Sequence, residues 1–302
     1  IIGIDSLNNA YDNRLKELRL SSLNEEPNFT FKLLNLSDAN TLDKESEIFE
    51  NVSTVLHLGA RAGVRQSFLD PTSYILDNTA ATANLALNVK KHKVKKFIIA
   101  STSSIYGDTG VGYAKENKDE LENPPSIYAA TKSFGEVLTR NILEDTDTII
   151  QIPRFFTVYG PFGRPDMSIL RFIHWISTNQ EVIIYGDGEQ KRSFTFISDI
   201  ISGLNKLFIH NDSGIFNFGS NETWSLNQVI DLIEKKLNKK AIIVNKDRAI
   251  KDVDIVLPSL ELSKSKLNWE PTTNIEDGIS ATVEWYKNNE NELKEIKFKY
   301  DY

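Results

Sequence analysis

The fold is decided by the stretch Lys95-Lys96-Phe97-Ile98-Ile99-Ala100-Ser101-Thr102-Ser103-Ser104-Ile105-Tyr106-Gly107. Its apolar first half is typical of a fully buried strand in a parallel sheet. A run of hydroxyl side chains follows where that strand ends. Open α/β sheets bind their ligands at the carboxyl ends of their strands. The stretch therefore predicts a parallel sheet with a binding site at one edge.

The segment Tyr128-Ala129-Ala130-Thr131-Lys132 is the second informative feature. A phenol and an ammonium four residues apart lie on the same face of a helix. The charge of Lys132 favours the phenolate and should lower the pKa of Tyr128 from its usual value of about 10. Such a tyrosine can take a proton from a sugar hydroxyl that Thr102 orients, which suits hydride transfer between a sugar alcohol and a nicotinamide. Taken alone, the pair also fits a half-buried tyrosine beside a solvated lysine, but its position after the buried strand favours the chemical interpretation.

Short β-branched runs alternate with helical patterns through the first half of the chain. We expect strands near 1–5, 29–34, 52–58, 97–100 and 148–154, and helices near 12–21, 37–49, 73–92 and 126–144. This alternation predicts an α/β protein with a doubly wound, Rossmann-type parallel sheet. After Gly160 the rhythm changes, which predicts a smaller C-terminal α/β lobe. We therefore expect domains at 1–160 and 161–302, with 198–219 returning to the first.

The composition excludes several classes of protein. A net charge of −7 over 302 residues gives no reason to expect a nucleic-acid partner, so local arginines would have to capture an anionic substrate. The chain has no cysteine, which rules out disulfides and fits a cytoplasmic location. No apolar run approaches 18 residues, so membrane spanning is not supported. The 4 histidines are scattered, so no metal site is expected.

Several residues are candidates for contacts with a dinucleotide or a diphosphate. Asp5 ends the first expected strand, where an acid can bind the adenosine ribose and repel a 2′-phosphate, which favours NAD over NADP. A helix-capping aspartate is the alternative. The small residues at 59–63 would let the backbone approach a flat cofactor. Arg192 and Arg248 suit bidentate binding of phosphate, although each also fits a surface arginine.

With these features in view, the chain resembles the extended short-chain dehydrogenase/reductase superfamily and, within it, the NAD-dependent UDP-glucuronate 4-epimerases. The resemblance runs over essentially the whole chain and rests on residues 5–8, 60–65, 101–107, 128–132, 154–167 and 191–199. It implies that Tyr128 deprotonates the sugar 4-hydroxyl while NAD takes the C4 hydride, and that the hydride returns to the other face of the sugar. Residues 1–160 would then bind NAD and residues 161–302 the UDP-sugar.

The resemblance also assigns the remaining site residues. It implies Thr102, Tyr128 and Lys132 as catalytic residues. Cofactor contacts would come from Asp5, Asn8, Asn35, Leu36, Leu58, Ala60, Tyr128 and Lys132, and substrate contacts from Arg65, Ser103, Ser104, Thr157, Arg164, Arg192 and Arg248. The family further implies a homodimer formed through the helices near 73–92 and 126–144.

Two departures from the family bear on the function. The glycine-rich phosphate loop is not found, and we expect it to precede Ile1 in a longer chain. Asn35 replaces the aspartate that the family usually has beside the adenine. Related dehydratases and decarboxylases carry a carboxylate near Ser103 and Ser104, and its absence here favours simple epimerisation. A UDP-glucuronate decarboxylase, a 4-epimerase of another UDP-hexose and a non-catalytic nucleotide-binding protein remain as alternatives.

Overall fold

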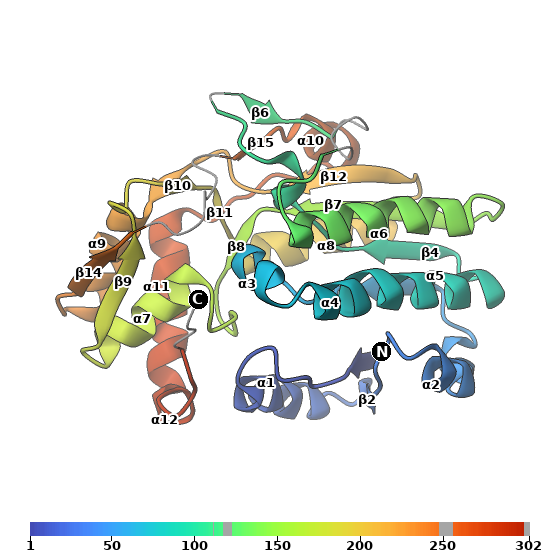
Figure 1. Ribbon diagram of the computed structural model, residues 1–302, viewed down its shortest axis with the longest axis horizontal. Coiled ribbons are helices and arrows are strands. Elements are labelled where there is room, and N and C mark those ends of the chain that lie inside the picture. Colours follow the sequence, from blue (N-terminus) through green and yellow to red (C-terminus); the bar gives the residue numbers. More distant parts are fainter. Residues whose placement is uncertain (111, 117–122, 248–255, 299–302) are drawn as a thin grey trace.

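A computed structural model describes the chain except for residues 111, 117–122, 248–255 and 299–302 (Figure 1). Its main sheet has the strand order β12-β7-β4-β3, and all neighbouring strands are parallel. The short strand β5 also pairs with β7. The bounds of these strands are β3 Thr54–His57, β4 Lys96–Ile99, β5 Ser101–Thr102, β7 Ile149–Phe155 and β12 Gly214–Phe218. The parallel α/β architecture expected from the sequence is confirmed.

Side chains of β4 alternate between two apolar layers, which explains the helices on both faces of the sheet. Phe97 and Ile99 pack in a cluster with Leu85 and Val89 of helix α5. Ile98 points the other way, into a cluster with Leu207 of helix α8. The helices of the first face are α5 (Ala81–Lys91) and α6 (Ile127–Leu143), and α8 spans Ile197–Ile209.

The first two strands do not join the main sheet. Strand β1 (Ile2–Asp5) pairs in parallel with β2 (Thr30–Leu33), and these two form a sheet of their own beside helix α1 (Asn13–Asn24) (Figure 1). Helix α2 (Ala39–Lys44) and a 3₁₀ turn, η1 (Ser46–Phe49), follow β2. The sequence predicts a single doubly wound sheet. Among the described residues this sheet is in two parts, β1-β2 and β12-β7-β4-β3.

The long helix expected over 73–92 is interrupted. It consists of α4 (Pro71–Tyr74), a π-helical segment η2 (Ile75–Ala80) and α5, and it follows the short helix α3 (Val64–Leu69). Helical spacing in the sequence does not distinguish a π turn from an α turn. The π turn places Asn78 so that its amide donates to the Arg61 carbonyl and to the Thr131 hydroxyl of α6. Such turns are frequent at functional sites.

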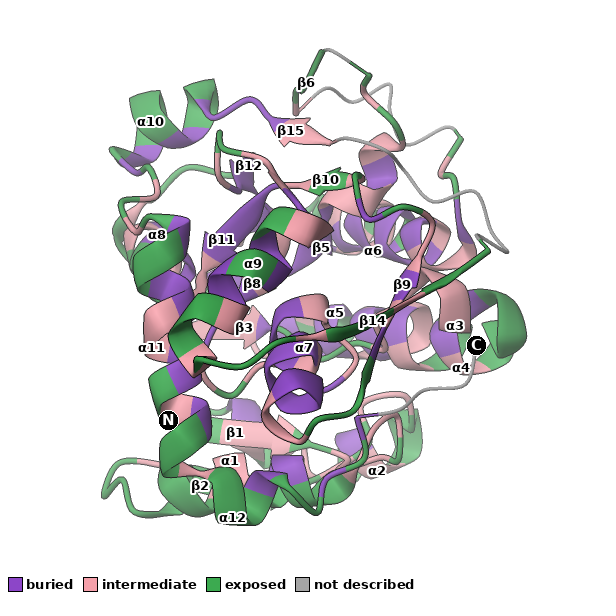
Figure 2. Ribbon diagram, turned by 90° about the vertical axis from the view of Figure 1, so that its left-hand side faces the viewer, coloured by how far each residue is buried: buried purple, intermediate pink, exposed green. Residues whose placement is uncertain are grey.

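The C-terminal lobe packs around three helices: α7 (Ser168–Ser177), α9 (Leu226–Leu237) and α11 (Ile275–Asn288). Helix α9 begins with a capping box formed by Ser225 and Gln228, and its buried and exposed residues lie on opposite faces (Figure 2). The lobe's other elements are β8 Thr157–Tyr159, β9 Glu181–Tyr185, β10 Lys191–Arg192, β11 Phe194–Phe196, β13 Trp224–Ser225, β14 Ile242–Lys246 and α12 Glu290–Leu293. A third group of elements, β6 (Tyr113–Ala114), β15 (Leu257–Pro258) and α10 (Glu261–Leu267), lies at the edge of the main sheet next to β12 (Figure 1).

Candidate active site

The expected catalytic residues meet where β4 ends and α6 begins. Ser126 caps α6, since its hydroxyl accepts from the Ala129 amide at 3.1 Å. Tyr128 and Lys132 therefore lie in the first two turns of this helix. The hydroxyl run follows β4 as β5 and the 3₁₀ turn η3 (Ser103–Tyr106), in which Thr102 accepts from the Ser104 amide at 3.1 Å. Helix α6 contacts both β5 and η3.

The phenol of Tyr128 differs in one respect from the expectation. Burial raises the pKa of Tyr128 above its usual value, while the hydrogen bond with Thr102 and the charge of Arg164 lower it. Lys132 is not among the groups that act on this pKa. The effect of Thr102 on this pKa agrees with the expectation, but the expected lowering of the tyrosine pKa by Lys132 is wrong. Burial of the phenol outweighs the favourable charge.

Lys132 is buried without a partner. Its side chain is 5% exposed, and its ammonium makes no hydrogen bond or ion pair with the described residues. Burial lowers the pKa of Lys132 to about 8, and the negative charge of Glu136 opposes this shift. A buried donor without an acceptor is costly. The site therefore fits a ligand that brings hydroxyl acceptors to Lys132, as the nicotinamide ribose of NAD would.

A buried ion pair supports α6 behind the site. The Glu136 carboxylate accepts from Arg154 of β7 at 3.0 and 2.9 Å and from the Ser101 hydroxyl at 2.5 Å. Both Glu136 and Arg154 are fully buried. Sequence reasoning missed Glu136, although it follows Lys132 by one helical turn and the spacing of Tyr128, Lys132 and Glu136 was available as a signal.

The candidate cofactor residues lie at the carboxyl ends of β1, β2 and β3. The Asp5 carboxylate accepts from the Leu7 amide at 2.6 Å, yet its side chain is 51% exposed and remains open to a ribose. Leu58 and Ala60 are exposed after β3. After β2, Asn35 accepts from Ser37, and Leu36 is half-buried.

Asn8 connects the small sheet to the main body. Its amide nitrogen donates to Asp77 of η2 at 3.4 Å, and Asp77 also accepts from Arg61 at 3.0 Å. The oxygen of Asn8 accepts from Lys16 at 2.9 Å. The candidate cofactor residues of β1 are thereby tied to the segment after β3.

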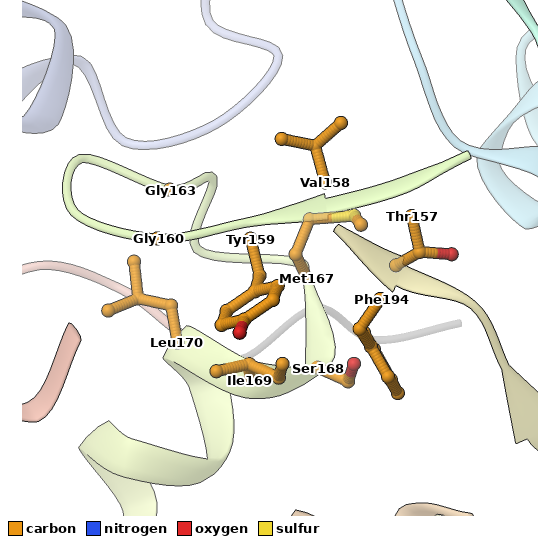
Figure 3. Close-up of a pocket in the computed structure, with 10 residues that line it drawn as sticks. All are labelled: Thr157, Val158, Tyr159, Gly160, Gly163, Met167, Ser168, Ile169, Leu170 and Phe194. Carbon is orange, nitrogen blue, oxygen red and sulfur yellow. The ribbon is translucent and has the colours of Figure 1, made fainter. Parts of the chain in front are cut away.

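The candidate substrate residues are divided between two places. Ser103 and Ser104 are half-buried next to Thr102. Arg164 is close enough to affect the pKa of Tyr128, and its guanidinium forms a bidentate pair with Asp166. Thr157 lines a small pocket together with Tyr159 and residues of the following loop and helix (Figure 3).

The other three candidate arginines come from separate parts of the chain. Arg65 lies over the ring of Tyr185 in β9, with 4.4 Å between its guanidinium carbon and the ring centroid. Arg192 is half-buried in β10 and donates to the Lys191 carbonyl at 2.8 Å. Arg248 lies outside the described residues. Neither Arg65 nor Arg192 has a recorded contact with Tyr128, so their substrate roles stay predictions.

The described residues contain neither a metal-binding cluster nor a membrane-spanning helix. No cluster of three or more His, Asp or Glu side chains in those ranges could hold a metal ion. None of the helices within them is both long and apolar enough to span a bilayer.

Comparison with known proteins agrees with this geometry. The chain matches the GDP-mannose 4,6-dehydratase family over residues 1–282. It is 40% identical over 300 residues to a UDP-glucuronate 4-epimerase of Thermodesulfobacterium geofontis, an alignment that covers 98% of this chain and 91% of the relative.

Solved structures are similar as well. The UDP-glucuronic acid 4-epimerase of Bacillus cereus, in complex with UDP-glucuronic acid and NAD, is 31% identical with a TM-score of 0.86, and the match covers 95% of this chain and 90% of that one. A UDP-N-acetylglucosamine 4-epimerase of Methanobrevibacter ruminantium is 26% identical with a TM-score of 0.83, covering 95% and 90% of the two chains. The chain belongs to the GDP-mannose 4,6-dehydratase family of extended short-chain dehydrogenases/reductases.

Proposed function

We propose that the protein is an NAD-dependent 4-epimerase that interconverts UDP-glucuronate and UDP-galacturonate. The observation that carries the proposal is the buried Lys132 ammonium, which has no partner among the described residues, on the same helix as Tyr128, a phenol whose pKa Thr102 lowers. The similarity to epimerases named for UDP-glucuronate supports this substrate.

The residues have distinct tasks in this reaction. Tyr128 takes the proton of the 4-hydroxyl and later gives it back, and Thr102 shares the hydrogen bond to the reacting oxygen. Lys132 holds the nicotinamide ribose. NAD, when bound, would accept the C4 hydride and return it to the opposite face of the sugar. Asp5 and Asn8 would hold the adenosine half, where the exposed carboxylate of Asp5 suits a ribose without a 2′-phosphate.

The position of Arg164 supports an acidic sugar. In a uronate the carboxylate is attached to C5, directly beside the reacting C4. A cation that acts on the pKa of Tyr128 would lie near that end of a bound sugar. Ser103 and Ser104 offer hydroxyl donors from the neighbouring turn, and no described residue of η3 is an acid. This arrangement suits recognition of a carboxylate and gives no second acid for decarboxylation or dehydration.

The proposal includes a division of labour along the chain. Residues 1–160, with 198–219, would bind NAD, which the pairing of β12 with β7 supports. Residues 161–302 would bind the UDP-sugar, with Thr157, Arg192 and Arg248 on the nucleotide and diphosphate side and Arg65 reaching toward them. A homodimer is also proposed, because Ile75, Leu76, Leu87 and Phe134 are exposed on the neighbouring segments η2, α5 and α6 (Figure 1). A cytoplasmic location stays a prediction.

The test of the catalytic assignment is Tyr128→Phe. Loss of the phenolic oxygen should abolish turnover of UDP-glucuronate, while the dissociation constant for UDP-glucuronate changes little because the ring remains. Calorimetry and a coupled activity assay measure the two quantities. Wild-type turnover in the Tyr128→Phe enzyme would refute Tyr128 as the base.

A further inference from the structure

The loop that carries Arg164 has an unfavourable backbone. It connects β8 to α7 and begins with Gly160 at φ +145°, followed by Phe162 at φ +57°. The left-handed region disfavours a residue with a Cβ atom, so Phe162 must be held there by its surroundings. Only two hydrogen bonds within the loop's backbone are recorded, from the Gly163 amide to Gly160 and from the Met167 amide to Arg164.

Arg19 of helix α1, near the N-terminus of the chain, donates hydrogen bonds to the backbone of this loop. Its Nε and Nη2 donate to the Phe162 carbonyl at 3.0 and 2.6 Å, and Nη2 also donates to the Gly163 carbonyl at 3.0 Å. Its Nη1 donates to the Tyr11 hydroxyl at 2.6 Å. The planar fork of arginine can make these bonds together, whereas a lysine ammonium cannot.

The other side of the loop is held by different contacts. The Phe162 ring packs on Trp285 of α11 with 5.0 Å between the ring centroids. The next cationic residue, Arg164, is paired with Asp166. Arg19 is therefore the contact that joins this loop to α1, the helix that follows the candidate cofactor residues Asp5 and Asn8.

We propose that Arg19 is a positioning residue that clamps the loop 160–167 and thereby holds Arg164 in place for the sugar. The proposal rests on the proposed function only for the identity of that sugar. Arg19 has no contact with Tyr128 and is not one of the residues that line the pocket of Figure 3, but it binds the carbonyl of Gly163, which is one of them, so its effect passes through the loop backbone.

The first test needs no substrate. In Arg19→Ala, the Gly163 and Met167 amides should exchange with solvent at least about ten-fold faster than in the wild type, because the loop loses its clamp. Arg14→Ala is the matched control: Arg14 lies on the same helix, is half exposed and pairs with Asp12 instead of the loop. Equal exchange in the Arg19→Ala and Arg14→Ala proteins would overturn the clamp, whatever the substrate is.

The second test is a double-mutant cycle in the full-length enzyme with NAD. Arg19→Ala should raise KM for UDP-glucuronate about ten-fold with a smaller change in kcat, and Arg19→Lys should restore little of it. In an Arg164→Ala background, Arg19→Ala should add almost nothing, since it acts through Arg164.

Two results would contradict the clamp's role. If the increases in KM caused by Arg19→Ala and Arg164→Ala multiply in the double variant, Arg19 acts independently of Arg164. If the Arg19→Ala enzyme has the wild-type KM, Arg19 does not position Arg164. Failure of the wild type to bind or convert UDP-glucuronate would count against the proposed function alone, because hydrogen exchange still decides the clamp.

Discussion

Two arginine–carboxylate pairs flank the candidate site, and they differ in burial. Arg154 and Glu136 are fully buried behind α6 and make two bonds to each other. Arg164 and Asp166 form the same kind of bidentate pair in the substrate loop, but Arg164 remains 29% exposed. A fully buried pair is not accessible to a ligand. A partly exposed pair at a site can exchange one carboxylate for another, so the comparison assigns support to the first pair and recognition to the second.

The largest expected effect is on the buried pair. Glu136→Gln removes the carboxylate that binds the buried Arg154 guanidinium through two hydrogen bonds, and should cost about 3–5 kcal/mol in the free energy of unfolding. Denaturant unfolding measures this. The double variant Glu136→Gln/Arg154→Met should recover most of the loss, because two neutral groups replace two charges. If Glu136→Gln is as stable as the wild type, the Arg154–Glu136 pair does not support the fold, and burial would not distinguish its role from that of Arg164–Asp166.

The exposed pair should show the opposite pattern. Arg164→Ala should weaken UDP-glucuronate binding by roughly 10- to 150-fold, the equivalent of about 1.5–3 kcal/mol for a lost charged hydrogen bond. The free energy of unfolding of Arg164→Ala should stay within about 1 kcal/mol of the wild-type value. Calorimetry with UDP-glucuronate and with UDP-glucose tests whether Arg164 recognises the sugar carboxylate. The affinity for the neutral UDP-glucose should fall less than the affinity for UDP-glucuronate. Equal losses for both sugars would place Arg164 on the nucleotide side.

The smallest expected effect is a shift in pH dependence. Lys132 acts as an ammonium with a pKa of about 8 in the free enzyme, so kcat/KM should fall as pH rises past about 8. Removing the charge of Glu136 lowers the pKa of Lys132 and moves this alkaline limb to lower pH. The only other titratable group coupled to Lys132 among the described residues is His57 of β3, which burial keeps neutral by lowering its pKa to about 3.

The stabilised double variant makes this measurement practical. In Glu136→Gln/Arg154→Met, kcat/KM should begin to fall at a lower pH than in the wild type. In Arg164→Ala it should fall at the same pH as in the wild type. An unmoved limb in the double variant would mean that Glu136 has no electrostatic role toward Lys132.

The sequence predicted the parts of the structure that local pattern determines. The apolar run of β4, the hydroxyl turn after it and the Tyr128–Lys132 helix follow from residue spacing, and all were found as expected. The family was also predicted correctly. Competing effects were harder to judge: burial of Tyr128 outweighs the charges near it, a balance that the sequence does not contain.

Long-range contacts could not be predicted from the sequence. Arg19 and Phe162 are 143 positions apart, and nothing in either segment indicates that they meet. The π turn at η2 depends on the contacts of Asn78 with Arg61 and Thr131, which join three separate segments.

The most direct test of the central claim is NMR spectroscopy of the products that the full-length enzyme forms from UDP-glucuronate with NAD. The account predicts UDP-galacturonate at equilibrium with its substrate and no net formation of NADH. A UDP-pentose with released carbon dioxide, or an accumulating 4-keto sugar, would contradict epimerisation and move the protein to decarboxylation. Binding of UDP-glucuronate without any product would contradict a catalytic role for Tyr128.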